Sequence, residues 1–153
     1  VLAAKFPPLG ERSYGGRRII DREGLNYSAT ANDNTILMLQ IESPQAVEKV
    51  DGIAGMEGVD ALFPGPDDIR LRLGYAMDSG FGMDQIEDAL RAVAEACRAH
   101  GKIAVTVAAD EAMAVSLAEM GYTMIVGCSD VGLVRSGSRK LADSFQAALG
   151  TAD

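Results

Sequence analysis

Two carboxylates, Glu42 and Asp68, each follow a predicted strand and are the side chains best placed for chemistry. In parallel sheets, ligands bind at the carboxyl ends of the strands, so both side chains are expected at one edge of the sheet. Hard divalent cations are held by one or two carboxylates, while water and substrate oxygens complete the coordination. The pair therefore predicts a metal site, and the sequence leaves Mg²⁺, Mn²⁺ and Co²⁺ open as its occupant.

A purely structural role for the same two residues stays open. In that interpretation, Glu42 caps the helix that follows it, and Asp68 occupies the first turn of the next helix. Both positions favour a negative charge, because the N-terminus of a helix carries a partial positive charge.

The turn Gly65-Pro66-Asp67-Asp68 is a second feature with chemical potential. It leads into the N-terminus of a predicted helix, where free backbone N–H groups bind anions such as carboxylates. An anion site beside a metal site suits a 2-oxo acid, because its carboxylate meets the N–H groups while its carbonyl oxygen meets the metal.

The other reactive side chains favour structural roles. His100, the single histidine, lies in the last turn of a predicted helix, where a cation interacts favourably with the helix C-terminus. Cys97 falls on the apolar face of that helix and is expected in the core. Cys128 follows a strand, where its position allows it to line a site, but it has no evident histidine partner to activate its thiol. The sequence contains no P-loop, no Rossmann glycine fingerprint and no serine nucleophile elbow.

Four strands that alternate with helices must position these residues. Apolar runs predict the strands, whereas capping residues, helical spacing and glycine stops predict the helices. We expect strands over 36–41, 59–63, 102–107 and 122–126, and helices over about 43–55, 67–73, 84–100, 110–120 and 131–149, the last broken near Gly137. Such alternation implies a parallel sheet with right-handed crossovers, and four units make half of a (β/α)8 barrel. The predicted fold class is α/β, the C-terminal half of a TIM barrel, with a small open α/β sheet as the alternative.

The chain is expected to divide into two parts. Residues 1–34 are predicted to hold the end of a preceding helix and then a long surface loop, because residues 6–34 lack periodicity. Residues 35–153 are predicted to hold the last four βα units. The loop is either solvated or covers a site or a neighbouring subunit, and it carries four arginines: Arg12, Arg17, Arg18 and Arg22. Because the sequence begins at Val1 without an initiator Met, we expect a piece of a longer chain whose N-terminal half-barrel is absent.

Composition limits the classes of partner. The chain has 153 residues, 48% of them hydrophobic, which is enough for one core. Its net charge of −8 argues against nucleic acid and against an anionic membrane surface as partners. No apolar run reaches transmembrane length, and no signal peptide opens the chain. Two cysteines are too few for a disulfide framework, so a reducing, cytoplasmic location is expected.

Several short motifs together resemble one enzyme family, the HpcH/HpaI aldolases. These class II pyruvate aldolases include 4-hydroxy-2-oxoheptanedioate and 2-dehydro-3-deoxyglucarate aldolases. The resemblance spans most of the chain and rests on Gln40-Ile41-Glu42, on Phe63-Pro64-Gly65-Pro66-Asp67-Asp68-Ile69, on the stretch from Lys5 to Ser13, on Gly58-Val59-Asp60, and on Met124-Ile125-Val126-Gly127 with Asp130.

The resemblance implies a (β/α)8 barrel that cleaves or forms a carbon–carbon bond of a 2-oxo acid through a metal-stabilised pyruvate enolate. Pyruvate and an aldehyde would be its small-molecule partners, with a homo-oligomer or a separate first half of the barrel as protein partners. It implies metal ligation by Glu42 and Asp68, and a catalytic contact of Gln40 with substrate or water. It also implies a pyruvate carboxylate held by the Gly65–Asp68 turn, which includes Pro66 and Asp67.

Two functional residues of the family are absent from this sequence. The first four strands of the family barrel should supply a catalytic histidine and a pyruvate-contacting arginine, and neither has a counterpart here. Two alternatives to the aldolase stay open, and the missing groups favour the second of them. One is a CoA-thioester lyase of the citryl- or malyl-CoA type on the same barrel, and the other is a non-catalytic half-barrel subunit.

Overall fold

The computed structural model describes residues 1–78 and 82–150 and contains a four-stranded parallel sheet. Its strands are β1 (Met38–Ile41), β2 (Ala61–Pro64), β3 (Ile103–Val107) and β4 (Met124–Val126), in the order β1-β2-β3-β4. Each strand pairs in parallel with the next one along the chain. The predicted α/β half-barrel of four strand–helix units is confirmed, and residues 79–81 and 151–153 of its predicted range lie outside the described residues.

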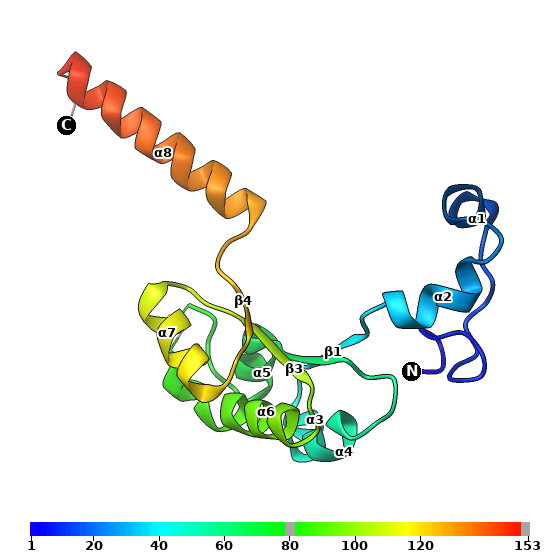
Figure 1. Ribbon diagram of the computed structural model, residues 1–153. Helices are drawn as coiled ribbons and strands as arrows, with labels where there is room; N and C mark the ends of the chain where they lie inside the picture. Colours follow the sequence, from blue (N-terminus) through cyan, green and yellow to red (C-terminus); the bar gives the residue numbers. More distant parts are fainter. Residues whose placement is uncertain (79–81, 151–153) are drawn as a thin grey trace.

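Helices connect the strands and flank them at both ends of the chain. They are α1 (Arg17–Glu23), α2 (Tyr27–Asn34), α3 (Pro44–Glu48), α4 (Val50–Ala54), α5 (Pro66–Arg72), α6 (Glu87–Ala99), α7 (Glu111–Met120) and α8 (Asp130–Leu149), with a 3-10 turn η1 (Met83–Gln85) before α6. In Figure 1, α3, α4 and α6 lie along the same side of the sheet, α1 and α2 form a separate lobe beside β1, and α8 projects away from the sheet.

The core lies between the sheet and α6. The strands contribute Ile41, Leu62 and Ala104 to it, and α6 contributes a helical stripe that includes Leu90 and Val93. All five are at most 2% exposed. Burying a side chain of the size of leucine contributes about 1.5–3 kcal/mol, so the apolar face of α6 is what holds it against the sheet.

The opposite face of the sheet, here called the open face, carries no helix among the described residues. Its exposed side chains are Met38, Gln40, Ile103, Met124 and Val126. Successive side chains of a strand point to opposite faces, which is why Gln40 lies on the open face while Ile41 lies in the core. The open face is the side that faces the interior in a closed barrel.

Capping residues mark the starts of α3 and α7. The Ser43 hydroxyl accepts a hydrogen bond from the Ala46 N–H at 3.1 Å, with Pro44 as the first helical residue. Asp110 caps α7 through the Met113 N–H at 2.8 Å. The end of α7 lies at Gly121, whose φ of 109° is accessible to glycine at little cost.

The amino ends of β1 and β2 are joined by a buried lysine. The Lys5 ammonium donates to the backbone oxygens of Asn32 and Thr35 and lies 3.3 Å from Asp60 Oδ2. The Asp60 carboxylate also accepts the Leu37 N–H at 2.7 Å. Partial burial acts to raise the pKa of Asp60, but the Leu37 N–H and the Lys5 charge outweigh it and hold that pKa below its ordinary value.

Four details differ from the prediction. Much of the expected loop over 6–34 is helical, because long-range contacts fix it: the Asn32 side chain accepts the Phe6 N–H at 2.7 Å and donates to the Phe6 oxygen at 2.9 Å. The expected helix over 43–55 is two helices that meet at Lys49. The expected helix start at Asp84 is a 3-10 turn, so α6 begins at Glu87. The expected break near Gly137 is absent, since a 20-residue helix absorbs the roughly 1 kcal/mol cost of one glycine.

Candidate metal centre

Glu42 and Gly65 lie side by side at the carboxyl edge of the sheet. Ile41 and Pro64 are register partners on β1 and β2, and the Gly65 N–H donates to the Ile41 oxygen at 3.0 Å. A Cβ added to Gly65 would lie 2.8 Å from Glu42 Cγ and 3.0 Å from Glu42 Oε1. The missing side chain of Gly65 therefore makes the room in which the Glu42 carboxylate approaches the start of α5.

Asp67 and Asp68 lie in the first turn of α5, and both are exposed. Gly65 is the N-cap residue and supplies no side-chain cap, and Pro66 occupies the first helical position. A negative charge is favoured in this turn by the partial positive charge of the helix N-terminus. The structure thus brings the Glu42 side chain to the turn that begins the helix of Asp68.

Neither Glu42 nor Asp68 is engaged in a hydrogen bond or an ion pair with another side chain among the described residues. The structural alternative for Glu42 is wrong, because Ser43 caps α3 in its place. Asp68 does occupy the helical first turn that its alternative expected. Glu42 follows β1 and Asp68 lies on α5, the helix that follows β2, and within the described ranges neither has an ion-pair partner, which fits the donor set that Mg²⁺ and Mn²⁺ prefer.

The candidate metal centre consists of two carboxylates, Glu42 and Asp68, and not of a larger set of protein ligands. Across residues 1–78 and 82–150, no group of three or more His, Cys, Asp and Glu side chains is arranged to hold a metal ion. Ions such as Mg²⁺ bind through one or two carboxylates and keep several water ligands, so a pair is sufficient for them. Gln40 lies on the open face of β1, two residues before Glu42, which follows the end of that strand.

His100 and Cys97 lie elsewhere, as expected. His100 follows α6, and its Nε2 atom lies 2.9 Å from Asp51 Oδ1 on α4, which places it toward the amino ends of the strands. Cys97 is buried in the core, where burial raises the pKa of its thiol and disfavours the nucleophilic thiolate. Cys128 is exposed after β4.

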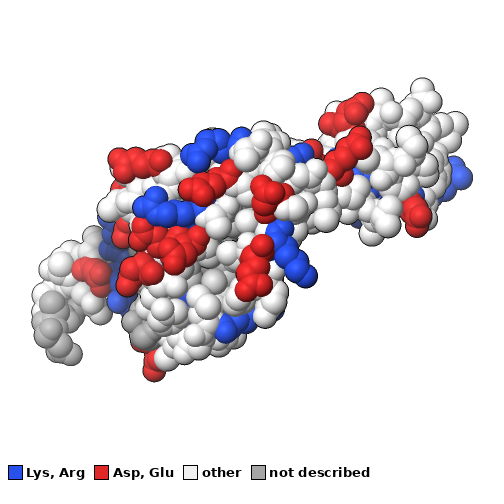
Figure 2. Space-filling view, turned by 90° about the horizontal axis from the view of Figure 1, so that it is seen from below, with Lys and Arg blue, Asp and Glu red and all other residues white. Residues whose placement is uncertain are grey.

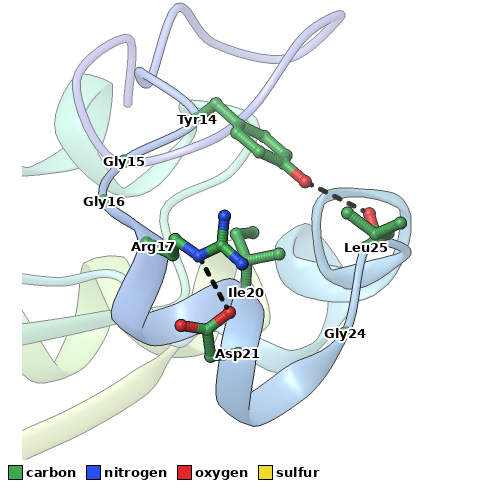
Figure 3. Close-up of a pocket in the computed structure, with 8 residues that line it drawn as sticks. All are labelled: Tyr14, Gly15, Gly16, Arg17, Ile20, Asp21, Gly24 and Leu25. Carbon is green, nitrogen blue, oxygen red and sulfur yellow. Dashed lines mark hydrogen bonds and ion pairs between the residues drawn. The ribbon is translucent and has the colours of Figure 1, made fainter.

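A hollow of about 530 Å³ lies in the N-terminal lobe, far from these residues in the sequence. Figure 3 shows its lining, in which the Tyr14 hydroxyl donates to the Leu25 oxygen at 3.4 Å and Arg17 pairs with Asp21 at 3.4 Å. Both polar contacts are internal to the lobe, and the ion pair is exposed. The described lining of this hollow therefore does not include a set of polar groups arranged for catalysis.

Arg70 is the residue near the pair that sequence reasoning missed. It follows the exposed Asp67 and Asp68 on α5, yet its own side chain is 2% exposed. A charged residue close to two carboxylates in the sequence predicts an exposed side chain. The one sequence signal for burial of Arg70 is its position directly after the apolar Ile69, which lies in the core.

The surface is mixed in charge. Figure 2 shows acidic side chains spread among basic ones over the face seen from below, without a continuous basic stripe on that face. Among the described residues, no helix combines the length and the apolarity needed to cross a bilayer.

Comparison with known proteins assigns the chain to a family. A family model described as HpcH/HpaI aldolase/citrate lyase matches residues 3–137. The 5-keto-4-deoxy-D-glucarate aldolase of Escherichia coli O6:H1 (strain CFT073) is 35% identical over 148 residues, which make up 95% of this chain and 57% of that protein. The chain therefore spans little more than half the length of the curated relatives that it matches.

Solved structures agree with this result. An HpcH/HpaI aldolase/citrate lyase family protein from Burkholderia cenocepacia J2315 superposes with a TM-score of 0.81 at 30% identity, over 94% of this chain and 57% of that one. Macrophomate synthase superposes with a TM-score of 0.79 at 28% identity, over 100% of this chain and 55% of that one. Because the family model covers most of the sequence and the half-barrel superposes on these enzymes, the chain belongs to the HpcH/HpaI aldolase/citrate lyase family.

Proposed function

We propose that this chain carries the metal site of a divalent-metal-dependent aldolase that cleaves or forms a carbon–carbon bond of a 2-oxo acid. The observation that carries the proposal is the Glu42 carboxylate, which lies against Gly65 at the start of α5 and has no ion-pair partner in the part of the chain that the structure describes. Family membership supports it, because the relatives named above include aldolases.

Glu42 and Asp68 would hold the cation, with Mg²⁺, Mn²⁺ and Co²⁺ as the candidates. When bound, a divalent ion supplies Lewis-acid polarisation of the 2-oxo group. The pair would orient the substrate by fixing the position of that ion, and no lysine is needed for this chemistry. The open-face Gln40 would contact the substrate or a water molecule beside the pair.

The turn from Gly65 to Asp68 would bind the pyruvate carboxylate. Gly65 offers no side-chain cap to the first N–H groups of α5, so these donors are not used by a capping side chain. Pro66 fixes the turn, and the N–H groups near Asp67 and Asp68 would donate to the carboxylate. The aldehyde partner would be chosen by loops, as in other barrels.

Four further strand–helix units, on the same protein or on a partner, would complete the barrel. The chain covers 57% of its curated relatives, and the open face exposes apolar side chains such as Met124. The missing units would supply a proton-transfer group, because the single histidine, His100, pairs with Asp51 at the other end of the sheet.

A second candidate keeps the same metal site and exchanges the substrate for a CoA thioester. It is favoured by the family description, which names citrate lyase beside the aldolases. Cleavage of citryl-CoA or malyl-CoA in the presence of Mg²⁺ would select this candidate over the aldolase.

Two measurements test the proposal. The first is Mn²⁺ binding by the chain, and the second is metal-dependent exchange of deuterium into the pyruvate methyl group, followed by mass spectrometry. We expect Mn²⁺ binding, and we expect exchange once the other half of the barrel is supplied. A folded chain that binds no Mn²⁺ would overturn the metal site, whereas binding without exchange would place the proton-transfer groups on the other half.

Glu42→Gln and Asp68→Asn are the matched variants. Each removes a charge but keeps the size of the side chain, and we expect each to abolish Mn²⁺ binding while the unfolding free energy changes by less than about 0.5 kcal/mol. If either variant fails to fold, the carboxylates are structural and the assignment is wrong.

A further inference from the structure

Arg70 is a buried charge beside the metal pair that the proposed function does not use. Its side chain is 2% exposed, although a guanidinium stays charged at any ordinary pH. The Arg70 Nε donates to Gln85 Oε1 at 2.6 Å, and Nη1 lies 3.7 Å from Asp67 Oδ1. One side chain therefore connects the first turn of α5 to the turn η1 that precedes α6.

The fold of α5 depends on few contacts. The helix has seven residues, which is too short to persist without tertiary support, and its buried side chains are Ile69 and Arg70. Ile69 belongs to the core and holds the helix near the sheet. A buried charge is expensive compared with an apolar side chain of similar volume, so net stability alone does not account for an arginine at this position.

The orientation of α5 decides where Asp68 lies relative to Glu42. Glu42 comes from the end of β1, whereas Asp68 comes from α5, so a shared cation requires that the two elements keep a fixed relation. Asp67, the neighbouring carboxylate, lies 3.7 Å from Arg70 Nη1, whereas Asp68 is in no ion pair among the described residues.

We propose that Arg70 is a positioning residue for the metal pair, which holds α5 through Gln85 so that Asp68 shares a cation with Glu42. This inference rests on the proposed metal site. It also predicts the direction in which the Mn²⁺ affinity changes when Arg70 is replaced. A positive charge near a divalent cation repels it, so a role through charge alone means that removing Arg70 tightens metal binding. A positioning role means that removing it weakens metal binding.

The experiment is Mn²⁺ binding to the chain, measured by calorimetry or by the electron paramagnetic resonance of free Mn²⁺. We expect Arg70→Met to raise the Kd about tenfold or more, the usual cost of losing a side chain that orients metal ligands. Arg72→Met is the matched control, because Arg72 lies on the same helix but is exposed, and its Kd should stay within about twofold of the unaltered chain.

A second control separates positioning from stability. Ile69→Val should lower the urea midpoint of unfolding without breaking the link between Arg70 and Gln85, and its Kd for Mn²⁺ should stay within about twofold of the unaltered chain. If Arg70→Met does not fold, Gln85→Leu removes the acceptor of the Arg70 Nε while Arg70 stays, and it should also weaken binding.

The outcomes are distinct. Unchanged or tighter Mn²⁺ binding by Arg70→Met, or by Gln85→Leu where the former does not fold, overturns the positioning role. An equal loss in Ile69→Val overturns it as well, because affinity then follows stability alone. If the unaltered chain binds no Mn²⁺, the proposed metal site fails and this inference fails with it.

Discussion

The two ends of the parallel sheet differ in whether their charged side chains have partners within the protein. At the amino ends, the buried Lys5 binds Asp60, and Asp60 also accepts the Leu37 N–H. At the carboxyl ends, Glu42 and Asp68 have no such side-chain partner among the described residues. Charges that are satisfied within a fold stabilise it, whereas charges left without a partner are available to a ligand. In barrels of this type, stability and catalysis are separated in the same way between the two faces.

Lys5→Met gives the sharpest test at the amino end. It leaves the Asn32 and Thr35 oxygens without their donor and Asp60 without its cation, so we expect a loss of about 3 kcal/mol in unfolding free energy, measured by urea denaturation. Mn²⁺ binding by the folded fraction should not change. Weaker Mn²⁺ binding by this variant would show that the amino end of the sheet also affects the metal site, contrary to the separation described above.

Two glycines allow a matched test of both ends. A Cβ on Gly65 would lie 2.8 Å from Glu42 Cγ, and a Cβ on Gly55 would lie 3.2 Å from His100 Cε1. Gly65→Ala should displace the Glu42 carboxylate and weaken Mn²⁺ binding about tenfold, whereas Gly55→Ala should leave it unchanged. Titration of both variants with Mn²⁺ checks this, and equal Kd values would mean that Gly65 does not shape the site.

Acid should destabilise the amino end through Asp60. The pKa of Asp60 is held below its ordinary value of 3.8, so the stability that its charge contributes is present above pH 3.8 and is lost as pH falls through the lowered pKa. We expect the difference in unfolding free energy between the chain and Asp60→Asn to shrink below that pH. A constant difference would show that Asp60 is not stabilised by its charge.

The pair of His100 with Asp51 should matter least. Both side chains are accessible to solvent, the aspartate 81% exposed, and exposed ion pairs contribute little. We expect His100→Ala to cost about 0.5 kcal/mol, measured by thermal unfolding, without a change in metal binding. A loss of Mn²⁺ binding in this variant would show that the two ends communicate.

The strands and helices of the half-barrel were predictable because the sequence signals for them are local. The apolar run that ends at Ile41, the cap at Ser43 and the stop at Gly121 each depend on neighbouring residues, and the structure has all three. The lobe of α1 and α2 was not predictable in this way, because Asn32 holds Phe6 across 26 positions of sequence.

The candidate site was predictable only in outline. The types and spacing of Glu42 and Asp68 indicated a metal pair, but the contact between Glu42 and Gly65 depends on the register of two strands. The buried Arg70 donates to Gln85, which lies 15 positions further along the sequence, and no local pattern predicts such a contact.

The pairing of Ile41 with Pro64 limits how the length of this chain can change. Because side chains alternate along a strand, deleting one residue inside β1 would turn Gln40 toward the helices and bring an apolar residue to the carboxyl edge. Substitutions in the strand change the site by degrees, whereas a single deletion would remove it at once. Insertions and deletions are therefore expected to accumulate in the connecting segments, with strand lengths held constant across functional members of the lineage.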